Sequence, residues 1–227
     1  MTERGMIFNA EMVRAILDGR KTQTRRPVKF PVHDKNLGCE LAGNELAGEL
    51  SAGNYLNSAF GKPGDRIWVR ETFCPVDDTQ YGGEKWVDYR ATPRYEASHP
   101  AGWDSAPNDA EALKWRPSIH MPRWASRILL EITDVRVERL NAISEEDAIA
   151  EGMQGVICPC CKGDSEYSTS QYDAETLAVV DEIPCRACES NRSKFFTLWD
   201  SIYGYGQHCI GEWVWVIEFK RVEGGAA

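Results

Sequence analysis

A basic run near the N-terminus carries residue types that amide chemistry needs. Gly19 is followed within seven residues by Lys21, Thr24, Arg25 and Arg26. A lysine whose pKa is lowered by desolvation can accept a proton, a threonine hydroxyl can act as a nucleophile, and a guanidinium group can hold a phosphate or a carbonyl oxygen. The alternative is a surface helix followed by a solvated basic strand, because charge runs are usually exposed.

Whether Lys21 and Thr24 can act together depends on the backbone between them. In a regular strand, residues three positions apart point to opposite faces. The two side chains therefore converge only if the chain is still turning after Gly19, although the long lysine side chain narrows the gap.

Four of the eight cysteines have the spacing of a metal site. Cys158 and Cys161 lie in a C-P-x-C-x-G turn typical of zinc ribbons, and Cys185 and Cys188 supply a second C-x-x-C pair. Four thiolates at this spacing predict a closed, structural zinc site (Zn²⁺) with no open position for catalysis. A redox-active dithiol is the alternative, and Cys160 could replace either of its neighbours as a ligand.

Aromatic and guanidinium side chains are interleaved between residues 115 and 124. Two prolines in this segment oppose helix and central-strand geometry, which predicts an extended, rigid segment. Aromatic rings stack on bases and guanidinium groups hold phosphates, so Trp115, Arg116, Arg123 and Trp124 are candidate ligand-binding residues. Packing of both tryptophans on the core is the alternative.

A strand predicted over residues 66–72 adds two candidates. Its alternation places Trp68, a candidate ligand-binding residue, on one face and Glu71 on the other, apolar face. A buried glutamate needs a partner, which Lys21 or an arginine could supply. The alternative is an edge glutamate in solvent.

Apolar periodicity predicts the elements that position these residues. A helix capped by Asn9 should end before Gly19, because a glycine often terminates a helix. Further helices are expected from Ser144 and over residues 191–203. Strands are expected over residues 86–91, 126–140 and 212–222.

Length and charge limit the classes of partner. The chain has 227 residues, of which 42% are hydrophobic, and a formal charge of −9. No apolar run reaches the about 20 residues of a membrane span, and no signal peptide is evident, which predicts a cytoplasmic protein without a membrane partner. The acidity argues against long duplexes, whereas net charges of +4 over residues 1–29 and 113–127 favour a nucleoside, a nucleotide or a short single strand. The oligomeric state stays open.

The run after the first predicted helix resembles the ASCH domain, a PUA-like β-barrel. Residues 19–26 read G-R-K-T-x-T-x-R, as in the small bacterial N4-acetylcytidine amidohydrolases. Gly64-Asp65 before a strand, an acidic helix over 143–153 and the closing strand over 216–220 add to this resemblance. The broader ASCH pattern often has an acidic residue near position 24, and Thr24 points instead toward the amidohydrolase branch.

The resemblance implies an α+β fold. It consists of one ASCH/PUA-like β-barrel domain over residues 1–227, with flanking helices and insertions. The expected insertions are a loop over 28–63, a loop with one strand over 74–114, and a zinc-ribbon-like module over 154–190. Insertions of this kind are similar to those of longer ASCH proteins from bacteriophages and prophages.

The resemblance also implies an activity, which is hydrolysis of the N4-acyl amide of a cytosine nucleoside or nucleotide. Thr24 would be the nucleophile, Lys21 its base, and Glu151 the carboxylate that orients the lysine or carries a proton to the leaving amine. Arg26 would hold a phosphate or a carbonyl oxygen, and Glu71 is the alternative carboxylate. The alternative functions are a non-catalytic RNA or modified-base binding module and a ribonuclease.

Overall fold

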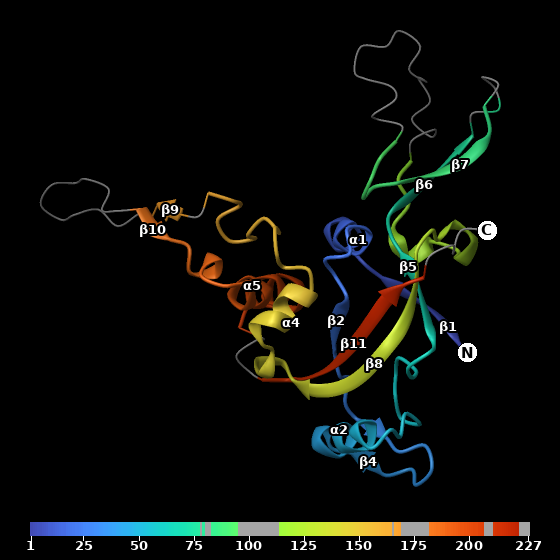
Figure 1. The fold of residues 1–227 in the computed structure, drawn as a ribbon, viewed down its shortest axis with the longest axis vertical. Coiled ribbons are helices and arrows are strands. Elements are labelled where there is room, and N and C mark those ends of the chain that lie inside the picture. Colours follow the sequence, from blue (N-terminus) through green and yellow to red (C-terminus); the bar gives the residue numbers. More distant parts are fainter. Residues whose placement is uncertain are drawn as a thin grey trace, which may run out of the picture. The chain divides into compact units, whose positions relative to one another are not determined.

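The protein has an α+β fold with few helices, and its chain divides into two compact units (Figure 1). The computed structural model describes residues 1–77, 79, 83–94, 114–164, 166–168, 182–206 and 211–222. The first unit comprises residues 1–19, 60–134 and 219–227, and the second comprises residues 20–59 and 135–218.

Three strands and a helix form the centre of the first unit. Strand β1 (Glu3–Ile7) pairs in parallel with β5 (Arg66–Arg70), which pairs antiparallel with the start of β8 (Leu129–Arg139). Helix α1 (Ala10–Leu17) begins where the Oδ1 of Asn9 accepts a hydrogen bond from the backbone N–H of Met12 at 2.8 Å. Gly19 has a φ of +75°, a conformation that favours glycine and lets the chain turn after the helix.

A hairpin and two short turns complete the first unit. Strand β6 (Phe73–Asp77) pairs antiparallel with β7 (Lys85–Tyr89), which confirms the strand expected near residue 86. The prediction of an extended segment over residues 115–124 is wrong in part, because the chain forms 3-10 turns over Ser118–His120 and Arg123–Ala125, and each turn follows a proline. Proline is compatible with the start of such a turn because it needs no backbone donor there.

In the second unit, two helices cover one face of the strands. Strand β2 (Gln23–Pro27) pairs antiparallel with β11 (Trp213–Arg221), and the strand order is β8-β11-β2. Helices α4 (Glu145–Ala150) and α5 (Asn191–Tyr203) lie side by side (Figure 1). Their apolar side chains pack with the buried face of β11 in one core, whose buried members are Leu140, Ile143, Ala148, Met153, Phe195, Trp199, Val214 and Val216.

The segment over 28–63, expected as a loop, contains regular structure. Strands β3 (Val32–His33) and β4 (Glu40–Leu41) pair antiparallel and lead into helix α2 (Gly43–Ser51). The Glu45 carboxylate accepts the backbone N–H of Ala42 at 2.9 Å, and Leu46 and Leu50 bury one face of the helix. A local cap and two apolar residues four positions apart therefore stabilise a helix in place of the expected loop, despite the two glycines within it.

The cysteine segment contains a small hairpin between its two C-x-x-C turns. Strands β9 (Glu166–Ser168) and β10 (Glu182–Pro184) pair antiparallel. The insertion expected over 74–114 holds β6 and β7, and its part over 95–113 lies outside the described residues.

A closed barrel is not confirmed. The strand order is β1-β5-β8 in the first unit and β8-β11-β2 in the second, and among the described residues neither set closes on itself. The ASCH/PUA-like barrel and its extent as a single domain stay predictions. None of the helices within the described ranges is long and apolar enough to span a bilayer.

Candidate functional site

Lys21 and Glu151, which the resemblance assigned to one catalytic site, are in direct contact. Just before β2, Lys21 and Glu151 form an isolated antiparallel β-bridge, and the Thr22 N–H donates to the Ala150 carbonyl at 2.8 Å. The Lys21 Nζ donates to Glu151 Oε2 at 2.6 Å and to the Glu151 main-chain oxygen at 2.8 Å. The side chain of Lys21 is 0% exposed and that of Glu151 is 3% exposed, so the pair is closed to solvent.

Arg25 is the cation that the sequence analysis did not place at this site. Its guanidinium group is 0% exposed and lies 2.6 Å from Glu138, 3.1 Å from Asp147 and 3.4 Å from Glu151. Residues 21, 23 and 25 share one face of an extended strand, so their spacing of two could have predicted that Arg25 lies on the same side as Lys21. We call Lys21, Arg25, Glu138, Asp147 and Glu151 the buried ion cluster.

In this cluster, burial and the nearest opposite charge shift the pKa values of Lys21 and Asp147 in opposite directions. Burial lowers the pKa of Lys21 below its ordinary value of 10.5, the Glu151 carboxylate opposes this, and Arg26 and Arg25 lower it further. Burial would raise the pKa of Asp147, but the hydrogen bond from Gln23 and the charge of Arg25 lower it overall. Each buried charge thus has an opposite partner, as burial of ions requires.

Thr24 belongs to the opposite face of β2. It stands between Gln23 and Arg25, both of which contact Asp147, so strand alternation turns its side chain away from the buried ion cluster. In the register with β11, Thr24 pairs with Ile217, whereas Arg25 pairs with Val216, which packs in the core with α4 and α5. The structure therefore brings Lys21 and Glu151 together but not Thr24.

Arg26 lies on the same strand face as Thr24. Its partner in the register with β11 is Trp215, and it is half-buried. The catalytic and binding roles of these residues stay predictions.

Glu71 points inward in the first unit, where Arg127 neutralises it. The Arg127 Nε and Nη2 donate to the two carboxylate oxygens at 2.9 and 3.0 Å, and Glu71 is 2% exposed. The Arg127 guanidinium also stacks on the Tyr89 ring, 3.9 Å from its centroid. Burial raises the pKa of Glu71, against the effect of Arg127.

Three of the candidate ligand-binding residues already contact neighbouring groups of the protein. Trp68 is half-buried with the Arg70 guanidinium 5.4 Å from its ring centroid, and Trp115 is half-buried with the Arg90 guanidinium at 5.3 Å. Arg116 is exposed, and its backbone is hydrogen-bonded to that of Phe73.

Trp124 is the exposed aromatic side chain of the segment. It is 70% exposed and stands beside Arg123, whose Nε lies 3.0 Å from the Glu3 carboxylate. Trp124 borders a hollow of about 280 Å³, whose other lining residues are Pro75, Val76, Asp77, Lys85, Trp86 and Val87. The sequence analysis missed Lys85 and Trp86, because only the hairpin of β6 and β7 brings them to residue 124.

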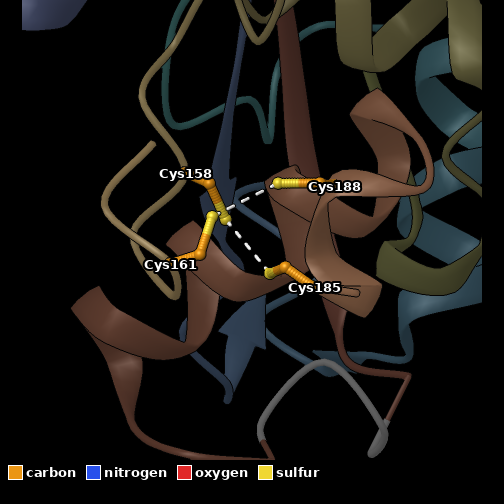
Figure 2. A group of neighbouring side chains, drawn as sticks. All are labelled: Cys158, Cys161, Cys185 and Cys188. Carbon is orange, nitrogen blue, oxygen red and sulfur yellow. Dashed lines mark hydrogen bonds between the residues drawn. The ribbon is translucent and has the colours of Figure 1, made fainter. Parts of the chain in front are cut away.

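The four-cysteine cluster, Cys158, Cys161, Cys185 and Cys188, brings its sulfur atoms close enough together to hold one metal ion. Figure 2 shows the four sulfur atoms pointing toward one another. All lie within 4.8 Å of one another, with 3.8 Å between the first and third and 3.5 Å between the second and fourth. Zn–S bonds of about 2.3 Å require sulfur separations of about 3.8 Å, so the cluster can hold a metal ion such as zinc.

The backbone of the first cysteine turn is shaped for this convergence. The Lys162 N–H donates to the Cys158 carbonyl at 2.9 Å, and Lys162 has a φ of +55°, which is unusual for a residue with a side chain. Cys160 is exposed and outside the cluster, so the structure selects Cys161. Hydrogen bonding to Cys161 raises the pKa of the Cys188 thiol to about 12.

Comparison with known proteins adds no relative. No protein-family model matches the chain, and neither a curated protein nor a solved structure matches it.

Proposed function

We propose that this protein recognises an unpaired or modified nucleobase, and that Trp124 provides the surface on which the base stacks. The observation that carries the proposal is the 70% exposure of this indole at the border of a hollow that also contains Trp86 and Lys85. A single exposed aromatic residue is not unusual, but one that borders a hollow lined by a second aromatic ring forms an exposed apolar patch, and such patches often mark binding sites.

The chemistry of the hollow suits one nucleotide. Trp124 and Trp86 line the hollow, and stacking on aromatic rings accepts any base. Lys85 and Arg123 lie in exposed ion pairs with Asp77 and Glu3, at 3.0 Å each. Exposed pairs contribute about 1 kcal/mol or less, so a phosphate group can displace the carboxylates.

The size of the hollow and the charge of the chain restrict the ligand class. A volume of about 280 Å³ is at the lower limit of small-molecule sites and accommodates one base or nucleoside. The net charge of −9 disfavours an extended polyanion. A short single strand with one inserted base meets both conditions.

Fluorescence anisotropy with labelled single-stranded RNA tests the proposal. One oligonucleotide carries N4-acetylcytosine and a second carries cytosine, and Trp124→Ala is compared with Tyr205→Ala, because Tyr205 is 98% exposed but distant in sequence from the hollow. Loss of one stacked base weakens binding by about 10- to 100-fold for Trp124→Ala only. Equal affinity of both variants, or no binding by the wild type, would refute the proposal.

An amidohydrolase acting on an N4-acylated cytosine nucleoside is the second candidate. The contact between Lys21 and Glu151 and the lowered pKa of Lys21 favour it, as does the resemblance of residues 19–26 to that family. The position of Thr24 on the other strand face weighs against a Lys-Thr-Glu site.

Release of cytidine distinguishes the two functions. Wild type, Lys21→Ala and Thr24→Ala are incubated with N4-acetylcytidine, and the products are separated by chromatography. A hydrolase releases cytidine with the wild type and loses the activity in both variants, whereas a recognition protein releases none. A ladder of shortened RNA would instead indicate a ribonuclease.

A further inference from the structure

We propose that a zinc ion in the four-cysteine cluster fixes the start of α5 against α4, so that the metal is an integral part of the core of the second unit. This inference is independent of the nucleobase site, because that site lies in the other unit.

The cysteine segment has little else to hold it together. The buried side chains of its cluster are cysteines, and among the described residues only Ala187 and the half-buried Cys188 pack against them. Such a small apolar cluster cannot offset the entropy of ordering the segment, and small modules of this kind usually depend on a metal or on disulfides.

The first end of the segment is anchored to the core beneath α4. Met153 is 2% exposed and Val156 packs on the same apolar cluster. The Arg20 Nη1 also donates to the Gln154 carbonyl at 2.8 Å. The first two cysteine ligands therefore begin two residues after a core residue, and seven residues after Glu151.

The second end of the segment leads directly into α5. Ser190, two residues after Cys188, caps the helix by accepting the Ser193 N–H at 3.0 Å. The Glu145 carboxylate of α4 accepts the N–H groups of Asn191 at 2.8 Å and Arg192 at 3.0 Å. Two of the N–H groups that α5 itself leaves unpaired at its start are thus satisfied by a side chain of α4.

A tetrahedral ion joins these two ends. It would bind two sulfurs from the turn after α4 and two from the turn before α5, and the facing cysteines, Cys158 with Cys185 and Cys161 with Cys188, are 27 residues apart in the sequence. Without the ion, the described residues join the two turns only through the three-residue ladder of β9 and β10, so α5 should loosen from α4 while the first unit is unaffected.

Metal content and hydrogen exchange of the full chain test the inference. The purified protein should contain one zinc per chain, and Co²⁺ in its place should give the intense visible bands of a tetrahedral thiolate site. Removal of zinc with a strong chelator should accelerate amide exchange in α5 by about tenfold or more. Exchange in β5 of the first unit should not change.

Matched cysteine variants separate the metal site from general thiol effects. Cys188→Ser should lose zinc and reproduce the faster exchange of α5, whereas Cys160→Ser, altered at an exposed thiol outside the cluster, should retain both. If Cys188→Ser does not fold, the chelation experiment on the wild type still decides.

Three results would overturn the inference. They are a folded wild-type protein without zinc, two disulfide bonds between the turns by mass spectrometry, and unchanged α5 exchange after complete zinc removal.

Discussion

Replacing Lys21 by methionine should strongly destabilise the second unit. The substitution keeps the length of the side chain but removes Nζ, which donates to the Glu151 carboxylate at 2.6 Å and to its main-chain oxygen at 2.8 Å. Glu151 is 3% exposed, so its charge would remain buried, and among the described residues the Arg25 guanidinium, at 3.4 Å, would be its remaining ion-pair partner.

The magnitude follows from the burial of the pair. Removing one partner of a buried ion pair costs about 3 to 5 kcal/mol, because the other charge stays in the interior without compensation. For a chain of this size, that loss lowers the melting temperature by about 10 °C. The double variant Lys21→Met, Glu151→Met removes both charges and leaves Arg25 with Glu138 and Asp147, so most of the stability should return.

Urea unfolding followed by circular dichroism provides the assay. The control is Lys220→Met, which breaks an ion pair with Glu131 of similar length, 2.9 Å, but with the lysine 63% exposed. An exposed pair contributes about 1 kcal/mol or less, so this variant should unfold almost as the wild type does.

The pH dependence of Glu151→Met carries a definite sign. The folded-state pKa of Lys21 lies below 10.5, so the unfolded chain binds more protons in that interval and stability rises with pH there. Without Glu151 the folded-state pKa falls further, because Glu151 favours the charged lysine. The cost of this variant should therefore be smaller at pH 9 than at pH 7.

A Lys21→Met cost no larger than that of Lys220→Met would refute the reasoning, as would a double variant less stable than either single one.

Two further predictions concern local structure. In α2, Gly43→Ala would place a Cβ 2.3 Å from the Trp213 indole and should cost about 1 to 3 kcal/mol, whereas Gly48→Ala meets nothing within 4 Å and should stabilise the helix by up to about 1 kcal/mol; thermal melts of both variants compare them directly. Equal melting temperatures would contradict this. The pKa of Asp65 is lowered because it accepts the Thr2 N–H at 2.7 Å, so the stability it contributes is present above pH 3.8 and is lost as the pH falls through the folded-state pKa. Asp65→Asn should flatten the acid limb of the stability profile, and an unchanged limb would contradict the assignment.

Local sequence signals predicted helices α1, α4 and α5. The Asn9 cap, the Ser144 cap with Asp147 and the apolar spacing of residues 195–202 each specify a helix through contacts within a few residues, and all three helices are present. The C-x-x-C spacings likewise predicted four sulfur atoms that converge. In these cases the determining interactions are short-range, so the sequence carries them.

Contacts between residues far apart in the sequence could not be predicted in the same way. Arg25 contacts three carboxylates that lie more than 110 positions away, and nothing local to the basic run indicates them. Glu71 was expected to need a cation, but the strand pattern did not distinguish Lys21 from Arg127. The hollow beside Trp124 depends on how a hairpin folds back, so the sequence could not identify Trp86 as its second ring.

The position of Glu151 argues for a structural role of the buried ion cluster. Helix α4 has only six residues, too few to be stable alone, and Glu151 directly follows it. Through Glu151 and Asp147, the helix is tied to Lys21 and Arg25 of the β2 segment, and through Glu145 it caps α5. Glu151 accepts hydrogen bonds from the fully buried Lys21 Nζ with both its carboxylate and its main-chain oxygen, and these contacts stabilise the junction. A substrate amide can reach this carboxylate only if the contact with Lys21 opens. The exposed indole in the other unit needs no such opening, and for this reason recognition is the simpler function for this chain.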